Sequence, residues 1–205
     1  LADRVNPEMQ QHLYDGRLHL SVYGKSLLAW STHKAGNVEQ TAMLRQNIEQ
    51  FLVEDAENET AYLRDETSWW YWYGSQIEAT AMYLKLLAVQ DPQSQIAPRL
   101  VKYLLNNRKH ATYWNSTRDT ALVVEAFSDY LKATGEGSST VAAEVWLDGK
   151  RLGRVEFTPE NLFTVNNTIS ISGAAIPVGE QQLEIRRVGD GPLYWNAYTT
   201  NFTME

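Results

Sequence analysis

Hydrophobic residues recur every three to four positions up to about Gly135, and every second position after Ser139. The first spacing is typical of helices with one buried face, and the second of half-buried strands. The change of period predicts two modules joined at residues 135–139. The expected fold class is α+β, with an α/α-hairpin array over residues 1–136 and an antiparallel β-sheet or sandwich over residues 140–205.

Six helices are predicted in the first module. Asn6 can cap the first of them, Pro7 suits its first position, and Gly16 ends it. Gly36 is a left-handed stop for the second. The expected ranges are residues 7–16, 20–34, 38–53, 75–89, 96–107 and 117–134. The expected buried stripe of the last helix is Val123, Val124, Phe127, Tyr130 and Leu131.

The helices pair along the chain into hairpins, 20–34 with 38–53 and 75–89 with 96–107, and helix 117–134 belongs to a third. Such a recurrence favours stacked or ring-forming αα-hairpins, and we interpret it as part of an α/α toroid.

In the second module, residues 141–147 alternate between apolar and polar types, and Asp148-Gly149 is a strong hairpin signal before a return strand at 151–157. Further strands are predicted at residues 168–172, 182–188 and 194–203.

An aromatic run, residues 69–73, lies between the helical hairpins. With residues 61–63 it could form a small β-hairpin or a tight aromatic elbow. The run could be a sugar-stacking platform, with Asp65, Glu66 or Glu78 as acid or base. We favour the alternative that the rings fill the gap between hairpins. The expected interior or interface cluster is Trp69, Trp70, Tyr71, Trp72, Tyr73 and Trp114.

Two helix starts have the spacing of capped termini. Ser75 and Glu78 have the form of a capping box, in which each side chain bonds the backbone N–H of the other. Ser116 can cap the last helix with Asp119 as its acidic partner, which leaves Arg118 solvated. These four caps are structural predictions, because no His base or oxyanion site is placed beside either serine.

Charge and composition exclude several functions. The net charge of −7 and the scattered basic residues argue against nucleic-acid binding. The absence of cysteine removes disulfides and thiolate metal sites. The histidines have no metal-binding spacing, and there is no phosphate loop, so no cofactor or metal is expected. No apolar stretch approaches the ~20 residues that cross a bilayer, so this segment is expected not to insert into a membrane.

Both capped helices carry a resemblance to a known family. Residues 77–87 read IEATAMYLKLL, and residues 116–127 read STRDTALVVEAF. They resemble two late helices of the thioester domains of α2-macroglobulin and complement proteins, where the Ser-Thr-x-Asp-Thr start is fairly specific. Residues 69–75, 103–108 and 113–115 are more similar to the bacterial α2-macroglobulin-like proteins. The resemblance covers residues 1–135.

The resemblance implies a large secreted or periplasmic protease trap. In that family a protease cuts a bait region, the molecule rearranges, and a Cys–Gln thioester acylates the attacker. The thioester must be kept dry until then, because water would hydrolyse it. Residues 140–205 would belong to the CUB-like domain that follows. The implied partners are target proteases and other macroglobulin-type domains of the same protein.

This sequence departs from the family chemistry, since it contains neither cysteine nor a Cys-x-Glu-Gln motif. Either that motif lies upstream of Leu1, in a chain expected to be processed or excised, or the parent protein lacks it. No reactive residue is therefore carried over, and we expect a non-catalytic scaffold. The alternatives are an α/α-toroid carbohydrate-active enzyme or sugar-binding module, and a helical-repeat scaffold that binds proteins.

The family order also makes residues 135–139 the point where the chain leaves an inserted helical domain and rejoins a β domain. The sheet after Ser139 would then lack upstream strands. We expect a sheet edge that has no partner strand within this chain. Such an edge is open to a neighbouring molecule, because unpaired edge amides invite pairing.

Overall fold

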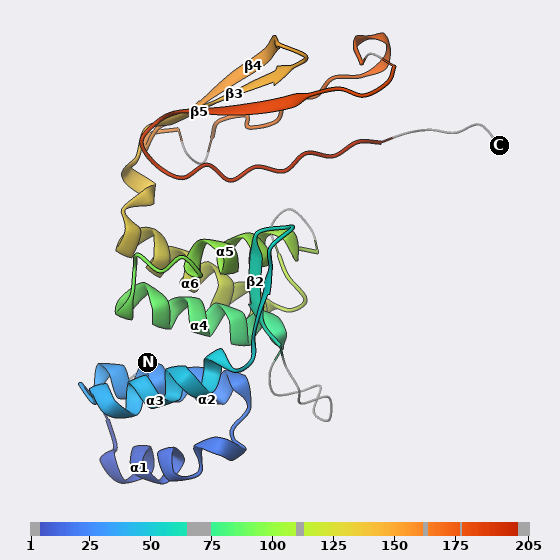
Figure 1. Cartoon of the computed structure of the whole chain (residues 1–205). Helices are drawn as coiled ribbons and strands as arrows, with labels where there is room; N and C mark the ends of the chain where they lie inside the picture. The colour runs from blue at the N-terminus through green and yellow to red at the C-terminus, as the bar shows by residue number, and fades with distance from the viewer. Residues whose placement is uncertain (1–4, 65–74, 110–112, 162–163, 177, 201–205) are drawn as a thin grey trace, which may run out of the picture. The chain divides into compact units, whose positions relative to one another are not determined.

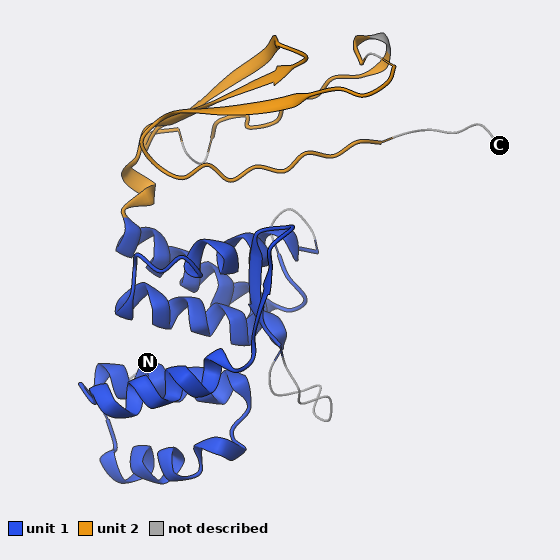
Figure 2. Ribbon diagram, in the orientation of Figure 1, with its two compact units in different colours: residues 1–134 blue, residues 135–205 orange. Residues whose placement is uncertain are grey.

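A computed structural model describes the chain at residues 5–64, 75–109, 113–161, 164–176 and 178–200 (Figure 1). The chain divides into two compact units, Leu1–Thr134 and Gly135–Glu205 (Figure 2). The described residues form six α-helices and two small antiparallel sheets, so the α+β fold class is confirmed. No described helix combines the length and the apolar character needed to cross a membrane.

The first helix begins at its predicted cap, Asn6, whereas the second begins two residues later than predicted, after Ser21. The Asn6 side chain accepts a hydrogen bond from Met9 N at 3.1 Å, and Gly36 has the left-handed φ of 75° after the second helix. The ranges are α1 (Pro7–Asp15), a 3₁₀ turn η1 (Arg17–His19), α2 (Val22–Lys34), α3 (Val38–Glu49), α4 (Gln76–Gln90), α5 (Ala97–Asn106) and α6 (Thr117–Thr134).

The third helix is shorter than predicted, because α3 ends at Glu49 rather than at residue 53. Strand β1 (Leu52–Asp55) follows it and pairs antiparallel with β2 (Thr60–Leu63). Helical spacing fits Phe51 and Leu52, but Leu52 pairs with Leu63 of β2, and a short apolar run does not distinguish a helix from a strand. The predicted partner for residues 61–63, the aromatic run 69–73, lies outside the described residues.

Helix α4 is the centre of unit 1. Residues 77–88 are all buried, because α4 packs against α2, α5, α6 and strand β2. Neighbouring helices pack in the expected pairs, α2 with α3 and α4 with α5. Helices α2, α4 and α6 are also in contact from one to the next, so alternate helices form a layer of their own (Figure 1).

The buried face of α6 differs by part of a turn from the predicted stripe. Val123, Ala126 and Tyr130 are buried, whereas Val124 is 56% and Leu131 36% exposed. The apolar residues of α6 span a wider arc than α4 covers, so the contact with α4 selects which of them are buried.

Unit 2 contains a three-stranded antiparallel sheet of order β4-β3-β5 (Figure 2). Its strands are β3 (Val141–Leu147), β4 (Lys150–Phe157) and β5 (Leu183–Gly189), with 3₁₀ turns η2 (Glu136–Ser138) and η3 (Gly173–Ala175). The predicted Asp148-Gly149 hairpin is confirmed. Both residues have positive φ, 48° and 78°, as a tight turn between right-twisted strands requires.

Two predicted strands of unit 2 are wrong in the described residues. Residues 168–172 and 194–200 belong to no strand, and residues 201–203 lie outside the description. Ile169 instead packs on Gly153 of β4, where an added Cβ would lie 2.9 Å from Ile169 Cδ1. Both segments have strand-like composition, but a strand forms only where a partner edge is within reach.

Candidate functional site

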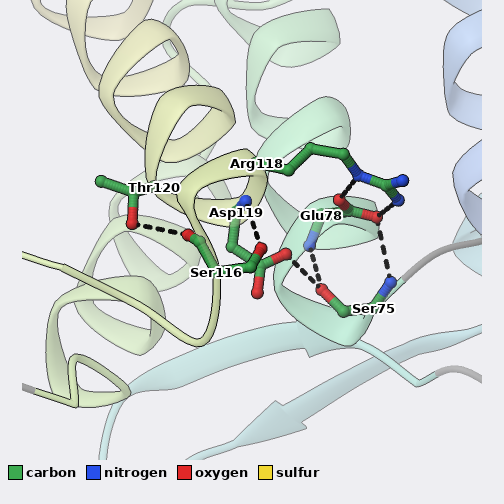
Figure 3. A network of polar contacts seen from close by, with 6 residues as sticks. All are labelled: Ser75, Glu78, Ser116, Arg118, Asp119 and Thr120. Carbon is green, nitrogen blue, oxygen red and sulfur yellow. Dashed lines mark hydrogen bonds and ion pairs between the residues drawn. The ribbon is translucent and has the colours of Figure 1, made fainter. Parts of the chain in front are cut away.

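The starts of α4 and α6 meet in one polar network (Figure 3). At α4 the predicted capping box is confirmed. Ser75 Oγ accepts a hydrogen bond from Glu78 N at 3.1 Å, and Glu78 Oε2 accepts one from Ser75 N at 3.2 Å. Two backbone groups that the helix itself cannot satisfy are thereby bonded.

At α6, Ser116 Oγ accepts a hydrogen bond from Asp119 N at 3.0 Å, as predicted for a cap. Thr120 Oγ1 donates to Ser116 O at 2.8 Å and tightens the same turn. The Asp119 carboxylate has a further role, because it accepts a hydrogen bond from Ser75 Oγ at 3.0 Å (Figure 3). The network therefore joins two helix starts through residues that are 44 positions apart in the sequence.

Arg118 is exposed, as expected, but it also has a partner that the sequence did not indicate. Its guanidinium donates from Nε and Nη2 to the two carboxylate oxygens of Glu78 (Figure 3). The Glu78 side chain is only 2% exposed, whereas that of Arg118 is 52% exposed. Sequence spacing cannot reveal this pair, because its members lie on different helices.

Burial and neighbouring charges shift two groups in the network. Burial raises the pKa of the Asp119 carboxyl, and the negative charge of Glu78 raises it further. The hydrogen bond from Ser75 lowers this pKa, but by less than burial raises it. The hydrogen bond to Glu78 raises the pKa of Arg118. Both acids also lie in the first turn of a helix, where the helix dipole favours negative charge.

We call this network of Ser75, Glu78, Ser116, Arg118 and Asp119 the latch, because it joins the starts of two helices. Both oxygens of Glu78 are bonded, to Arg118 and to Ser75 N, and Asp119 is 3% exposed. A general acid or base needs a proton-transfer partner within reach of a substrate, and neither carboxylate has open access. Asp65 and Glu66, the other acids considered for an enzyme, lie outside the described residues.

A second polar contact joins the same two helices two turns further on. Lys85 of α4 is 7% exposed, and its Nζ lies 2.8 Å from Glu125 Oε2 and 3.1 Å from Asp129 Oδ2 of α6. Burial lowers the pKa of Lys85, but its bonds to the two acids outweigh this, and the net pKa is raised. The sequence analysis did not predict this contact. A lysine among the apolar residues of one helix, and two acids four residues apart on another, could have indicated it.

Trp114, the one member of the aromatic cluster in the described residues, belongs to the core. It is 4% exposed, its Nε1 donates to Leu104 O at 2.7 Å, and its ring meets Phe127 edge-on at 6.1 Å between centroids. The other members, Trp69 to Tyr73, lie outside the described residues. Among the residues that are described, no group of three or more His, Asp or Glu side chains could hold a metal ion.

Comparison with known proteins adds no family assignment. A scan against protein families finds no family model that matches the chain, and no curated protein matches it. The functional argument therefore rests on the motifs and on the contacts that their residues make.

Proposed function

We propose that this chain is a non-catalytic part of an α2-macroglobulin-like, broad-spectrum protease inhibitor of the periplasm or the extracellular space. Unit 1 would be the later hairpins of its α/α-toroid, thioester-type domain. Unit 2 would be part of the following CUB-like β-sandwich. The partners would be target proteases and the other macroglobulin-type domains of the same protein.

The main support is the contact between the two helix starts that carry the resemblance. Ser75 and Glu78 begin α4, Ser116 and Asp119 begin α6, and these four residues with Arg118 make one network. The pairing of Arg118 with Glu78 joins the two helix starts beyond what their caps alone supply.

The packing of alternate helices is a second support. In an α/α toroid every other helix faces the inside, so inner helices contact one another and each outer helix packs on its hairpin partner. The contacts of α2 with α4 and of α4 with α6, with α3 on α2 and α5 on α4, follow that pattern. A helical repeat that binds proteins would share this packing, so the preference for the toroid rests on the motifs.

The role assigned to this chain is scaffolding. It has no cysteine and cannot supply a thioester nucleophile. The latch and the Lys85 contact fix α6 against α4 at two levels, which would keep the helical domain rigid while other parts of a protease trap rearrange. The aromatic run 69–73 would line the interior of this domain or its seam with a neighbour.

The test uses the full-length parent protein and two proteases, trypsin and elastase. After incubation we expect each protease to lose activity on a large protein substrate while it keeps activity on a small peptide substrate, since a trap blocks access and leaves the protease site intact. Trypsin with its nucleophilic serine replaced by alanine is the matched control, because it cannot cut a bait region. Unchanged activity on the large substrate, or capture of the inactive trypsin, would contradict the proposal.

A further inference from the structure

The connection between β4 and β5 is held at two points. Near its start, Ile169 packs on Gly153 of β4, where an added Cβ would lie 2.9 Å from Ile169 Cδ1. At its end, Gln182 N donates to Asp148 Oδ1 at 2.9 Å, directly before the first residue of β5. The part of the connection between these two points contains residues 170–176 (Figure 1).

Residues 170–176 have few interactions of their own. Their hydrogen bonds, within the described part of the chain, are those of the short 3₁₀ turn η3, which closes with Ile176 N donating to Gly173 O at 3.1 Å. Ile171 is 36% and Ile176 41% exposed. A segment with so few buried contacts opens locally at a low cost in free energy. Exposed loops of small and polar residues are preferred sites of proteolytic cutting.

The amino acids of this segment determine which class of protease fits it. Residues 172–176 read SGAAI, so the side chain before each of the bonds Ala174–Ala175 and Ala175–Ile176 is a methyl group. Elastase-type serine proteases have a small S1 pocket, which accepts such side chains. No lysine or arginine occurs between Arg154 and Arg186, so trypsin-type proteases, whose S1 pocket contains an aspartate, have no target there.

Other turns of unit 2 are better protected. Asn161 fixes the start of the same connection, because its side chain accepts a hydrogen bond from Thr158 N at 2.8 Å and donates one to Glu156 O at 2.9 Å. The Asp148-Gly149 turn is two residues long, so it cannot enter a protease cleft unless β3 and β4 unpair. Residues 170–176 can enter a cleft while the sheet stays paired.

We propose that unit 2 carries a processing site for elastase-type serine proteases at the bonds Ala174–Ala175 and Ala175–Ile176. The protease serine attacks the carbonyl carbon of the alanine, the C–N bond breaks, and the amine of the following residue leaves with a proton. Water then hydrolyses the acyl-enzyme and leaves a carboxylate on the alanine. This inference concerns the chain itself and does not depend on the protease-trap proposal.

The cut leaves unit 2 folded. Each residue of β5, Leu183–Gly189, has a partner in β3, and this pairing does not pass through the connection that is cut. The part of the chain after the cut therefore stays bound. Because the chain has no cysteine, noncovalent contacts alone hold the two parts together.

The test treats the 205-residue chain with pancreatic elastase or with trypsin and locates the cuts by mass spectrometry of the fragments. We expect elastase to cut between Ala174 and Ile176, and the two fragments to elute together from a size-exclusion column and to separate only in urea. An intact segment 173–176 while elastase cuts elsewhere, for example after Ala197, would overturn the proposal. Release of the C-terminal fragment without urea would overturn it as well.

Two variants separate the preference of the protease from the accessibility of the loop. Ala174→Asp with Ala175→Asp places charge where the S1 pocket is small and apolar, so cutting by elastase should slow by about tenfold or more. Ala175→Arg should make the same loop a trypsin site, while Arg154 and Arg187, which lie in β4 and β5, stay uncut. Circular dichroism spectra equal to that of the wild type establish that both variants fold.

Each variant has a result that contradicts the proposal. Unchanged cutting of the double aspartate variant by elastase would show that the alanines do not select the protease. Resistance of the Ala175→Arg chain to trypsin at this position would show that the loop is not accessible. Either result would overturn the processing site.

Discussion

Arg118 is half exposed, yet it neutralises a carboxylate that is almost fully buried. A buried carboxylate without a partner is costly, because the interior cannot replace the water that solvates the charge. The bidentate fork of an arginine satisfies both oxygens of Glu78 at once. At this position the arginine thus permits an acidic cap to be buried between two helices.

Removing this arginine should destabilise unit 1. For Arg118→Ala we expect the free energy of unfolding to fall by about 2 kcal/mol, because Glu78 keeps its burial and loses a charged partner. The exposure of Arg118 places the loss below that of a fully buried pair. Urea denaturation followed by circular dichroism measures it.

The matched control is Arg99→Ala. Arg99 Nη1 lies 2.8 Å from Glu54 Oε2, but both side chains are well exposed, so the loss should stay below about 0.5 kcal/mol. Combining Arg118→Ala with Glu78→Gln should recover part of the loss, because the buried charge is then absent. Equal losses for the two arginines would contradict the latch.

The raised pKa of Asp119 predicts that the stability of the fold depends on pH. Burial raises the pKa of this carboxyl above its ordinary value of 3.8, so the folded state holds a proton that the unfolded state has already released. Its contribution to stability is therefore greatest below pH 3.8 and is lost as the pH rises through the folded pKa. Relative to Asp119→Asn, the wild type should lose stability over that window. Urea denaturation at several acidic pH values tests this, and a relative gain with rising pH would contradict it.

Among the elements, the β3–β4 hairpin depends on its turn. Gly149 has a φ of 78° and no atom within 4 Å of an added Cβ, so a substitution there acts through the backbone alone. Gly149→Ala should destabilise unit 2 by about 1–2 kcal/mol, the cost of a left-handed conformation for an L-residue.

Gly137→Ala is the control for this prediction, because Gly137 has equal space around it and no positive φ. It should leave stability nearly unchanged. Hydrogen exchange of the β3 and β4 amides would report on unit 2, while the far-ultraviolet helical signal reports on unit 1. Similar losses at both glycines would argue against a backbone origin.

Elements with their own start and stop signals were predicted well. Helices α4 and α6 begin at the predicted caps, and the β3–β4 turn lies where Asp-Gly places it. The end of α3 and strand β1 were not, because residues up to 53 fit a helix locally, whereas Leu52–Asp55 become a strand through pairing with β2. Local signals define boundaries, whereas pairing across the chain overrides them where the signals are weak.

At the scale of the whole molecule, the two units are organised differently. Unit 1 is organised around a single buried helix, α4, with alternate helices in contact on either side. Unit 2 is one twisted sheet whose β5 edge is unpaired in the described residues. The first arrangement supports the proposed scaffold role, and the protease-trapping experiment addresses it.

The sequence by itself determined the α+β class, most helix starts and the central hairpin, because capping, glycine conformation and hydrophobic period act over a few residues. Only the tertiary structure decided that Arg118 binds Glu78, that Asp119 bonds Ser75, and which side of α6 is buried. These contacts join residues about 40 positions apart. They exist because two helix ends converge, and no local pattern encodes where distant helices meet.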